Sequence, residues 1–375
     1  MNMPVAVGCI GDRGVGERGR HVAICPGGIL LLGALAVGVS ALHAQVRVEG
    51  RLVDAGDDSP VVGAMVALLD DTGELTRTLS NDVGDFLLRA PAAGPFSLLV
   101  ERIGYRSQVV SVPDPGRPVL VRLPVQPVAL PGIDVQVEPV CALAANTSVE
   151  ILAVWDEIRK ALSAAALTAE PPLVFQVRTF ERELERDLDP RSLRADTLLV
   201  PEGLGFEFAD AEQLEANGWT EPAEDGGTRY FAPSPDLLLS SWFTRAHCFE
   251  LTATETDRLA LRFRSGEAAH GVRIEGSFVL DAAAARLSHI AFRFTGDRLL
   301  NAEHQGGEIH LGGLPDGRWY VSRWTMRTPE YRRGPLRRTQ MGRRLLYQPT
   351  TTLSGYFERG GEVLQVVTLT PGRPR

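Results

Sequence analysis

Lysine is almost absent from the sequence. Lys160 is the only lysine among the 39 lysines and arginines of the chain. We interpret this as a GC-rich coding bias rather than as selection for the bidentate anion contacts that arginine makes and lysine does not. The 47 acidic residues outnumber the basic ones, and the formal net charge is −8. This balance argues against a general nucleic-acid-binding protein, which needs a basic footprint.

The common motifs of nucleotide and hydrolase chemistry are also missing. The sequence has no P-loop and no G-x-G-x-x-G dinucleotide fingerprint. It has no G-x-S-x-G nucleophile elbow. His289, His304 and His310 are scattered singly, without the helical i,i+4 pairing of many metal centres, and we expect surface or core histidines there. The sequence therefore predicts no catalytic residue, no cofactor and no metal, and so no enzyme.

No apolar run is long enough to cross a bilayer. The longest, residues 29–42, has about 14 residues, short of the roughly 20 that a spanning helix needs. Arg13, Arg18 and Arg20 precede it as a basic n-region, and small residues follow it. We predict a signal peptide over residues 1–44, cleaved after Ala44 or after Ala41. The predicted location is the periplasm or the cell envelope, either outer-membrane associated or secreted; an uncleaved anchor is the alternative.

Cysteine is scarce, with four residues in the chain. Cys9 and Cys25 fall in the predicted signal peptide, so the mature chain keeps Cys141 and Cys248. An even pair in an oxidising compartment predicts a disulfide. It would close a loop of about 107 residues and contribute roughly 4–5 kcal/mol in the chain-entropy model. The alternative is two buried free thiols.

Short segments with alternating apolar residues, separated by glycine and proline turns, fill the region from Val46 to Leu123. This spacing is typical of a β-sandwich. The seven predicted strands cover residues 46–53, 61–69, 75–80, 85–89, 96–100, 108–112 and 119–123.

The turn glycines and inward-facing residues of this region follow a family pattern. It reads G-x-[VL]-x-D, then P-[VL]-x-G-A-x-V-x-L, then T-x-[ST]-x-x-x-G-x-F-x-[LF], then a G-x-[YF]-x-L-x-V strand and a closing G-Y. The residues that carry it are Gly50, Asp54, Pro60, Gly63, Ala64, Val66, Leu68, Thr78, Ser80, Gly84, Phe86, Leu88, Gly94, Phe96, Leu98, Val100, Gly104 and Tyr105. The region resembles the carboxypeptidase regulatory-like domain, a transthyretin-like or Ig-like sandwich that looks like the carbohydrate-binding-like superfamily. The resemblance implies an accessory module of exported envelope proteins, not a peptidase.

The chain beyond this region reads as a second domain. Four prolines mark residues 125–140 and their border as a linker, which separates residues 45–124 from residues 141–375. Ile151, Trp155, Ile158 and Leu162 sit at helical spacing and predict one long helix over residues 148–168. Thr147 and Glu150 fit a capping box at its start.

Alternation with a period of two returns after this helix. Residues 181–194 are charged and are expected to be a solvated stretch, and residues 210–227 a loop or short helix. The further predicted strands cover residues 173–180, 247–252, 259–263, 272–280, 287–295, 307–311, 319–327 and 363–369. We expect a mainly β protein whose C-terminal α+β domain places one helix on a curved antiparallel sheet. Residues 276–281 with 287–294 resemble strand pairs of LolA-like lipoprotein carriers.

His247-Cys248-Phe249-Glu250 reads H-x-x-E, the zinc-ligand spacing of metallocarboxypeptidases. On a strand, His247 and Glu250 would lie on opposite faces. A third ligand would have to be His270, His304 or His310, none of which has a recognisable setting. A zinc-peptidase relative is therefore only a remote alternative.

An arginine cluster stands out in this acidic chain. It comprises Arg332, Arg333, Arg337, Arg338, Arg343 and Arg344. Such a cluster can meet phosphate-bearing lipid headgroups or an acidic partner; the alternative is a solvated hairpin loop. Nearby, a regular strand would put Tyr320 and Trp324 on one face and Trp319 on the other.

The function predicted from the sequence is non-enzymatic. We expect an exported envelope protein with an accessory sandwich and a C-terminal binding or scaffolding domain. Its partner would be a glycan, a lipid or an envelope protein, and not nucleic acid. The alternative is a periplasmic carrier that holds a lipid or another apolar ligand between sheet and helix.

Overall fold

The computed structural model describes most of the chain after the predicted signal peptide. The described residues are 46–90, 94–126, 140–141, 143, 148–167, 174–200, 208–224, 227–255, 258–266, 271–281, 283–297, 299–341 and 344–367. The predicted signal peptide, most of the predicted linker, Thr147, His270 and Arg343 lie outside them. Residues 43–375 cluster as one compact unit.

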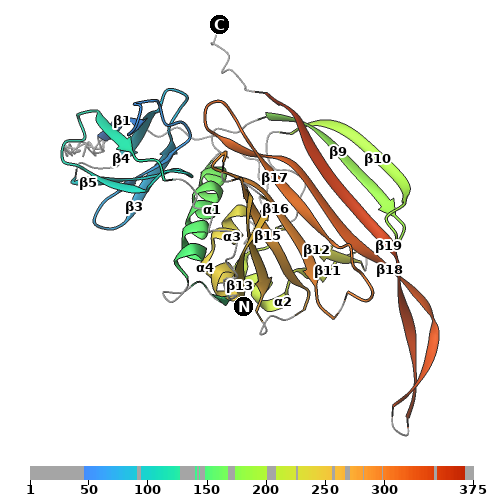
Figure 1. Ribbon diagram of the computed structural model, residues 1–375. Coiled ribbons are helices and arrows are strands. Elements are labelled where there is room, and N and C mark those ends of the chain that lie inside the picture. The colour runs from blue at the N-terminus through green and yellow to red at the C-terminus, as the bar shows by residue number, and fades with distance from the viewer. Residues whose placement is uncertain are drawn as a thin grey trace, which may run out of the picture. The chain divides into compact units, whose positions relative to one another are not determined.

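The N-terminal region is the expected seven-stranded sandwich (Figure 1). Its strands are β1 (Val46–Asp54), β2 (Met65–Leu69), β3 (Glu74–Leu79), β4 (Asp85–Ala90), β5 (Phe96–Glu101), β6 (Gln108–Val112) and β7 (Val119–Leu123). One sheet has the order β4-β1-β7 and the other β3-β2-β5-β6. Alternate residues such as Leu52 and Leu98 are fully buried between the sheets, while Leu87 faces water. The hydrophobic alternation therefore selects this fold.

The second predicted strand is shorter than expected. It begins at Met65, whereas the apolar run suggested residue 61. Pro60 forms an isolated bridge with Val53, and Gly63 has a φ of +69°. Such a φ belongs to the left-handed region, so the chain turns at Gly63 instead of extending through it.

The rest of the described chain is organised around a ten-stranded antiparallel sheet. Its order is β10-β9-β19-β18-β17-β16-β15-β14-β13-β8. The helices are α1 (Val149–Leu167), α2 (Ala211–Asn217), α3 (Pro235–Leu239) and α4 (Ser241–Ala246). The strands are β8 (Val140–Cys141), β9 (Val174–Leu184), β10 (Pro190–Val200), β11 (Thr220–Pro222), β12 (Thr228–Tyr230), β13 (His247–Glu255), β14 (Arg258–Ser265), β15 (Arg273–Asp281), β16 (Arg286–Thr295), β17 (Gly306–Gly313), β18 (Trp319–Met341) and β19 (Arg344–Val367). The predicted mainly β fold with one long helix is confirmed.

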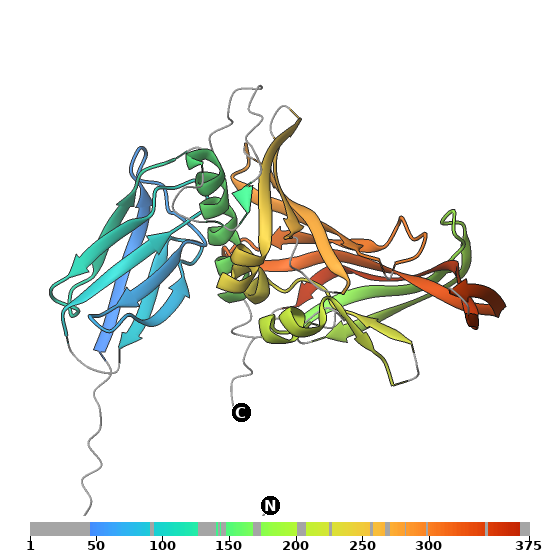
Figure 2. The same cartoon turned by 90° about the horizontal axis from the view of Figure 1, so that it is seen from below.

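The helices cover one face of this sheet (Figure 2). The stripe predicted for α1 is buried there, with Ile151, Ile158 and Leu162 fully enclosed. The Trp155 ring lies 5.7 Å from that of Phe249. Ser148 caps the helix, because its Oγ accepts a hydrogen bond from the N–H of Ile151 at 3.3 Å.

Residues 181–194 are largely exposed to solvent, as expected, but most of them belong to strands. They continue β9 to Leu184 and begin β10 at Pro190, so the two strands form a hairpin. Almost every side chain of β10 is exposed. A strand with water on both faces has no apolar alternation, so the hydrophobic pattern did not indicate a strand here. Cross-strand pairing with β19, including the ion pair of Arg182 with Glu358, supports β9.

The last two strands are much longer than expected, at 23 and 24 residues. The prediction for the tryptophans was wrong. The pairing of β18 with β17 shifts between His310 and Leu311, which leaves Ser322 as an extra residue. This bulge puts Trp319 and Trp324 on the same buried face.

Candidate functional site

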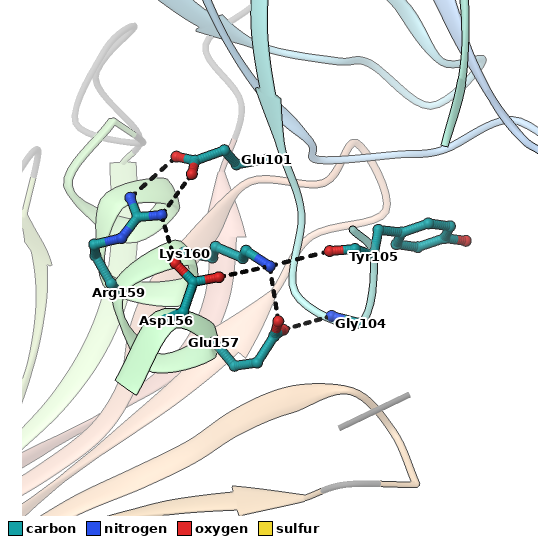
Figure 3. Close-up of polar contacts among 7 residues, drawn as sticks. All are labelled: Glu101, Gly104, Tyr105, Asp156, Glu157, Arg159 and Lys160. Carbon is teal, nitrogen blue, oxygen red and sulfur yellow. Dashed lines mark hydrogen bonds and ion pairs between the residues drawn. The ribbon is translucent and has the colours of Figure 1, made fainter. Parts of the chain in front are cut away.

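Charged residues of α1 meet the end of the sandwich in a buried cluster (Figure 3). The Nζ of Lys160 donates hydrogen bonds to Glu157 Oε1 at 2.7 Å and to the carbonyl oxygen of Tyr105 at 3.0 Å. Asp156 Oδ2 lies 3.0 Å from the same ammonium. Lys160 is 3% exposed and Glu157 5%, so water contributes little to their solvation. Backbone groups of the sandwich stabilise these charges instead, since Glu157 Oε2 accepts a hydrogen bond from the N–H of Gly104 at 2.7 Å.

A second ion pair lies beside the first. Arg159 donates two hydrogen bonds to the buried carboxylate of Glu101, at 3.0 and 2.5 Å, and a third to Asp156 at 2.8 Å. The hydrogen bonds to Glu101 are the main reason why the pKa of Arg159 is raised above its ordinary value. Bidentate contacts of this kind fix the relative orientation of the two side chains as well as pairing their charges. The cluster therefore fastens β5 to α1.

Apolar and backbone contacts complete the same interface. Ile103 of the sandwich is buried in the hydrophobic core formed by α1 and the large sheet. Gly63 and Gly317 touch through their backbones, because a Cβ on Gly317 would lie 2.3 Å from Gly63 N and Cα. A Cβ on Gly104 would lie 2.8 Å from that of Ala285. These contacts hold the sandwich to the second region at several points, so it is a docked module.

The sequence did not identify this cluster. A signal was present, because Glu157 and Lys160 stand on the same stripe of α1 as the buried Ala161 and Ala164. Charged residues are almost never fully buried unless they are paired. All five charged side chains of the cluster have partners, so the arrangement is suited to holding two surfaces together rather than to proton transfer.

The face of the sheet opposite the helices is polar. Across β13 to β16 the described side chains there include Glu250, Arg262, Ser277 and Arg264, and they line an open groove of about 450 Å³. Glu275 forms an ion pair with Arg293 at its border. A groove of this kind offers hydrogen-bonding and charged groups alongside some apolar surface.

The H-x-x-E spacing does not form a zinc site in this fold. His247 belongs to the buried face of β13, whereas Glu250 lines the opposite polar groove, as the strand geometry predicted. The Nδ1–H of His247 donates to the carbonyl oxygen of Phe243 at 2.9 Å. Burial lowers the pKa of His247 to about 4. Among the described residues, no group of three or more His, Cys, Asp or Glu side chains could hold a metal ion.

The other candidate histidines lie in two places. The rings of His289 and His310 stack with centroids 5.0 Å apart, and His310 Nε2 lies 3.0 Å from Glu308 Oε2. Burial, and then the neighbouring His310, lower the pKa of His289. His304 packs against Tyr356 instead. The structure therefore does not gather these residues with His247.

Cys141 and Cys248 face each other across the β8–β13 pair, and their sulfur atoms are bonded. The arginine cluster is not a loop, because Arg332, Arg333, Arg337 and Arg338 belong to β18 and Arg344 begins β19. The first four side chains are exposed.

Comparison with known families identifies one part of the chain. Residues 46–123 form an Ig-like sandwich module. Residues 47–125 match the model of the carboxypeptidase regulatory-like domain, which confirms the predicted resemblance. No curated protein matches the chain. The resemblance of residues 276–294 to LolA-like carriers stays a prediction. In the part of the chain that is described, no helix is long and apolar enough to span a membrane.

Proposed function

We propose that this protein is a non-enzymatic, exported cell-envelope protein that binds a polar partner on the open face of its large sheet. The sandwich serves as an accessory module that is docked on α1. One observation carries the proposal. The helix-covered face of the sheet is filled by side chains, whereas the opposite face exposes rows of charged residues and the groove around Arg262.

The alternative of a lipid carrier has less support. An apolar ligand between sheet and helix would need space there. Trp155, Phe249 and Phe278 occupy that region, and the Trp155 ring lies 5.7 Å from that of Phe249 and 5.9 Å from that of Phe278. The open face is polar and suits a glycan or the charged surface of an envelope protein better than an acyl chain.

Cell fractionation tests the export part of the proposal. We expect the full chain, expressed in a Gram-negative bacterium, to reach the periplasm or outer-membrane fraction. Its intact mass should correspond to cleavage after Ala44 or Ala41. An uncleaved chain that remains in the cytosol would contradict export.

Cosedimentation with washed envelopes tests the binding part. We expect the purified mature protein to be retained, and Arg262→Glu with Arg264→Glu to reduce retention, because both side chains border the groove. Arg117→Glu with Arg122→Glu is the matched control, since both are exposed residues of the sandwich and two charges are again reversed. Equal retention of both variants would exclude the groove as the binding surface.

A further inference from the structure

The last two strands continue beyond the rest of the sheet as a two-stranded ribbon (Figure 1). The pairing of β18 with β17 ends at Arg327, and the pairing of β19 with β9 ends at Tyr356. From there to the tip the two strands pair, among the described residues, only with each other. We call the described residues 328–341 and 344–355 the arginine ribbon.

Beyond Glu330, the arginine ribbon carries charge of one sign. From Tyr331 to Gly355 the sequence has six arginines and no aspartate or glutamate. The four arginines whose side chains are described, Arg332, Arg333, Arg337 and Arg338, are exposed. None of them forms an ion pair with any residue that the structure describes, although elsewhere Arg159, Arg182 and Arg327 all do. The ribbon thus places unneutralised positive charge on a protein of net charge −8.

A β-bulge places these arginines on two different faces of the ribbon. The register of the ribbon shifts between Arg333 and Leu336, where Gly334 and Pro335 stand against Thr350 alone. Thr350 Oγ1 donates to the carbonyl oxygen of Pro335 at 3.0 Å and holds the bulge in place. Arg333 pairs with Thr351 and Leu336 with Pro349, two positions apart on β19.

Residues two apart on a strand share a face, and so do directly opposed residues. The bulge therefore puts Arg333, Leu336 and Arg338 on one face, together with Tyr347, which pairs with Arg338. We call these four residues the Arg333 face. Arg332 and Arg337 are left on the opposite face.

The Arg333 face combines cationic and apolar groups. Leu336 is 64% exposed and Tyr347 63% exposed, among the most exposed large apolar residues described. Cationic side chains beside exposed aliphatic and aromatic ones are the combination that binds at the headgroup level of a membrane. Arginine also makes bidentate contacts to phosphate.

We propose that the Arg333 face of the arginine ribbon binds the headgroups of an anionic phospholipid surface. This inference rests on the proposed envelope location and names the surface on which the protein would sit. Each arginine that approaches such a surface is attracted to the negative potential of its phosphates.

Two other modes of binding fit the ribbon less well. Addition of a partner's strand to its free edges would need donors along them, and Pro335 and Pro349 supply none. Insertion into hydrocarbon would leave the outward backbone groups of both strands without hydrogen bonds. The ribbon is therefore suited to lying at the interface.

Binding to vesicles tests the proposal with the full mature chain. The probes are vesicles of phosphatidylcholine with a quarter phosphatidylglycerol, and vesicles of phosphatidylcholine alone. We expect binding to the former only, weakened by salt. Arg333→Glu with Arg338→Glu should reduce the affinity at least about thirtyfold, from the attraction lost by two arginines.

The matched control reverses the same number of charges on the opposite face. Arg332→Glu with Arg337→Glu should reduce the affinity no more than about fivefold, because screening weakens charges held about one Debye length away. Leu336→Ser with Tyr347→Ser should also weaken binding, without any change in net charge. Circular dichroism checks that each variant is folded.

Three outcomes would overturn the proposal. They are no binding to the anionic vesicles, equal losses from the two charge reversals, and tighter binding to polyglutamate than to the vesicles. The last would identify the ribbon as a docking surface for an acidic protein. Because the assay uses purified protein, its failure would leave the export and groove experiments unaffected.

Discussion

The two ends of the ten-stranded sheet are built differently. At the β8–β13 end, helices cover one face, a disulfide joins two strands and buried ion pairs attach the sandwich. At the other end, β10 is exposed along its length, and no other described strand pairs with the arginine ribbon on either side. Arginine occurs at both ends. Where it meets a carboxylate, as Arg159 does, it stabilises the fold; where it has none, it remains available to an external partner.

Removal of the disulfide should have the largest effect on the anchored end. Cys141 and Cys248 are 107 residues apart in the chain, and a closed loop of that length restricts the unfolded state strongly. We expect Cys141→Ser with Cys248→Ser to lower the free energy of unfolding by about 4–5 kcal/mol. Urea denaturation measures it. An intact mass without the two-hydrogen deficit of a disulfide would show that the native protein lacks this bond.

Removal of the lysine ammonium should have an effect of similar size. Lys160→Met leaves Glu157 buried without its cation, which typically costs about 3–5 kcal/mol. The double variant Lys160→Met with Glu157→Gln should recover part of the lost stability, since Glu157 is then no longer a buried charge without a partner. If the single and double variants are equally stable, the buried pair does not hold the interface.

The buried histidine should make the anchored end sensitive to acid. The pKa of His247 is about 4 in the folded protein and 6.5 in an ordinary histidine, so the unfolded chain binds the proton first. Stability should therefore fall as the pH drops from 6.5 to 4, by up to about 3 kcal/mol. Denaturation of His247→Phe across this range should show a smaller slope. An unchanged slope would assign the acid sensitivity to other groups.

Substitutions in the arginine ribbon should have the smallest effect on stability. Arg333 and Arg338 are exposed and make no ion pair with described residues, so Arg333→Glu with Arg338→Glu should change the free energy of unfolding by less than about 0.5 kcal/mol. Hydrogen exchange should also be faster in β18 beyond Thr328 than in β14 and β15. A large loss of stability would mean that the arginine ribbon also contributes to the stability of the fold.

The sandwich could be predicted almost completely, because its inward residues alternate and its turns contain glycine. Only some strands of the C-terminal sheet could be predicted. β10 and the ribbon carry no apolar alternation, since water reaches both of their faces. The short helices α3 and α4 were missed, although Ser234 and Ser240 cap them and Pro235 starts the first.

The buried cluster could not be derived from local patterns. Glu101 and Arg159 are 58 residues apart, and nothing in either segment indicates that they meet. The faces of β18 depended on bulges at Ser322 and at Gly334, each of which inverts the inside–outside pattern beyond it. A single extra residue in a strand is a small change in register. Gly334 and Pro335 are a sequence signal for the second bulge, whereas Ser322 is none for the first.

The position of the only lysine has a practical consequence. Lys160 is enclosed between α1 and the turn at Gly104 and Tyr105, with 3% of its surface exposed. Amine-reactive dyes and crosslinkers should therefore label the folded chain at its α-amino group and hardly at all elsewhere. A second label, found by peptide mapping at Lys160, would report that the sandwich has separated from the helix. The chain thus contains its own single-site probe for the opening of this interface.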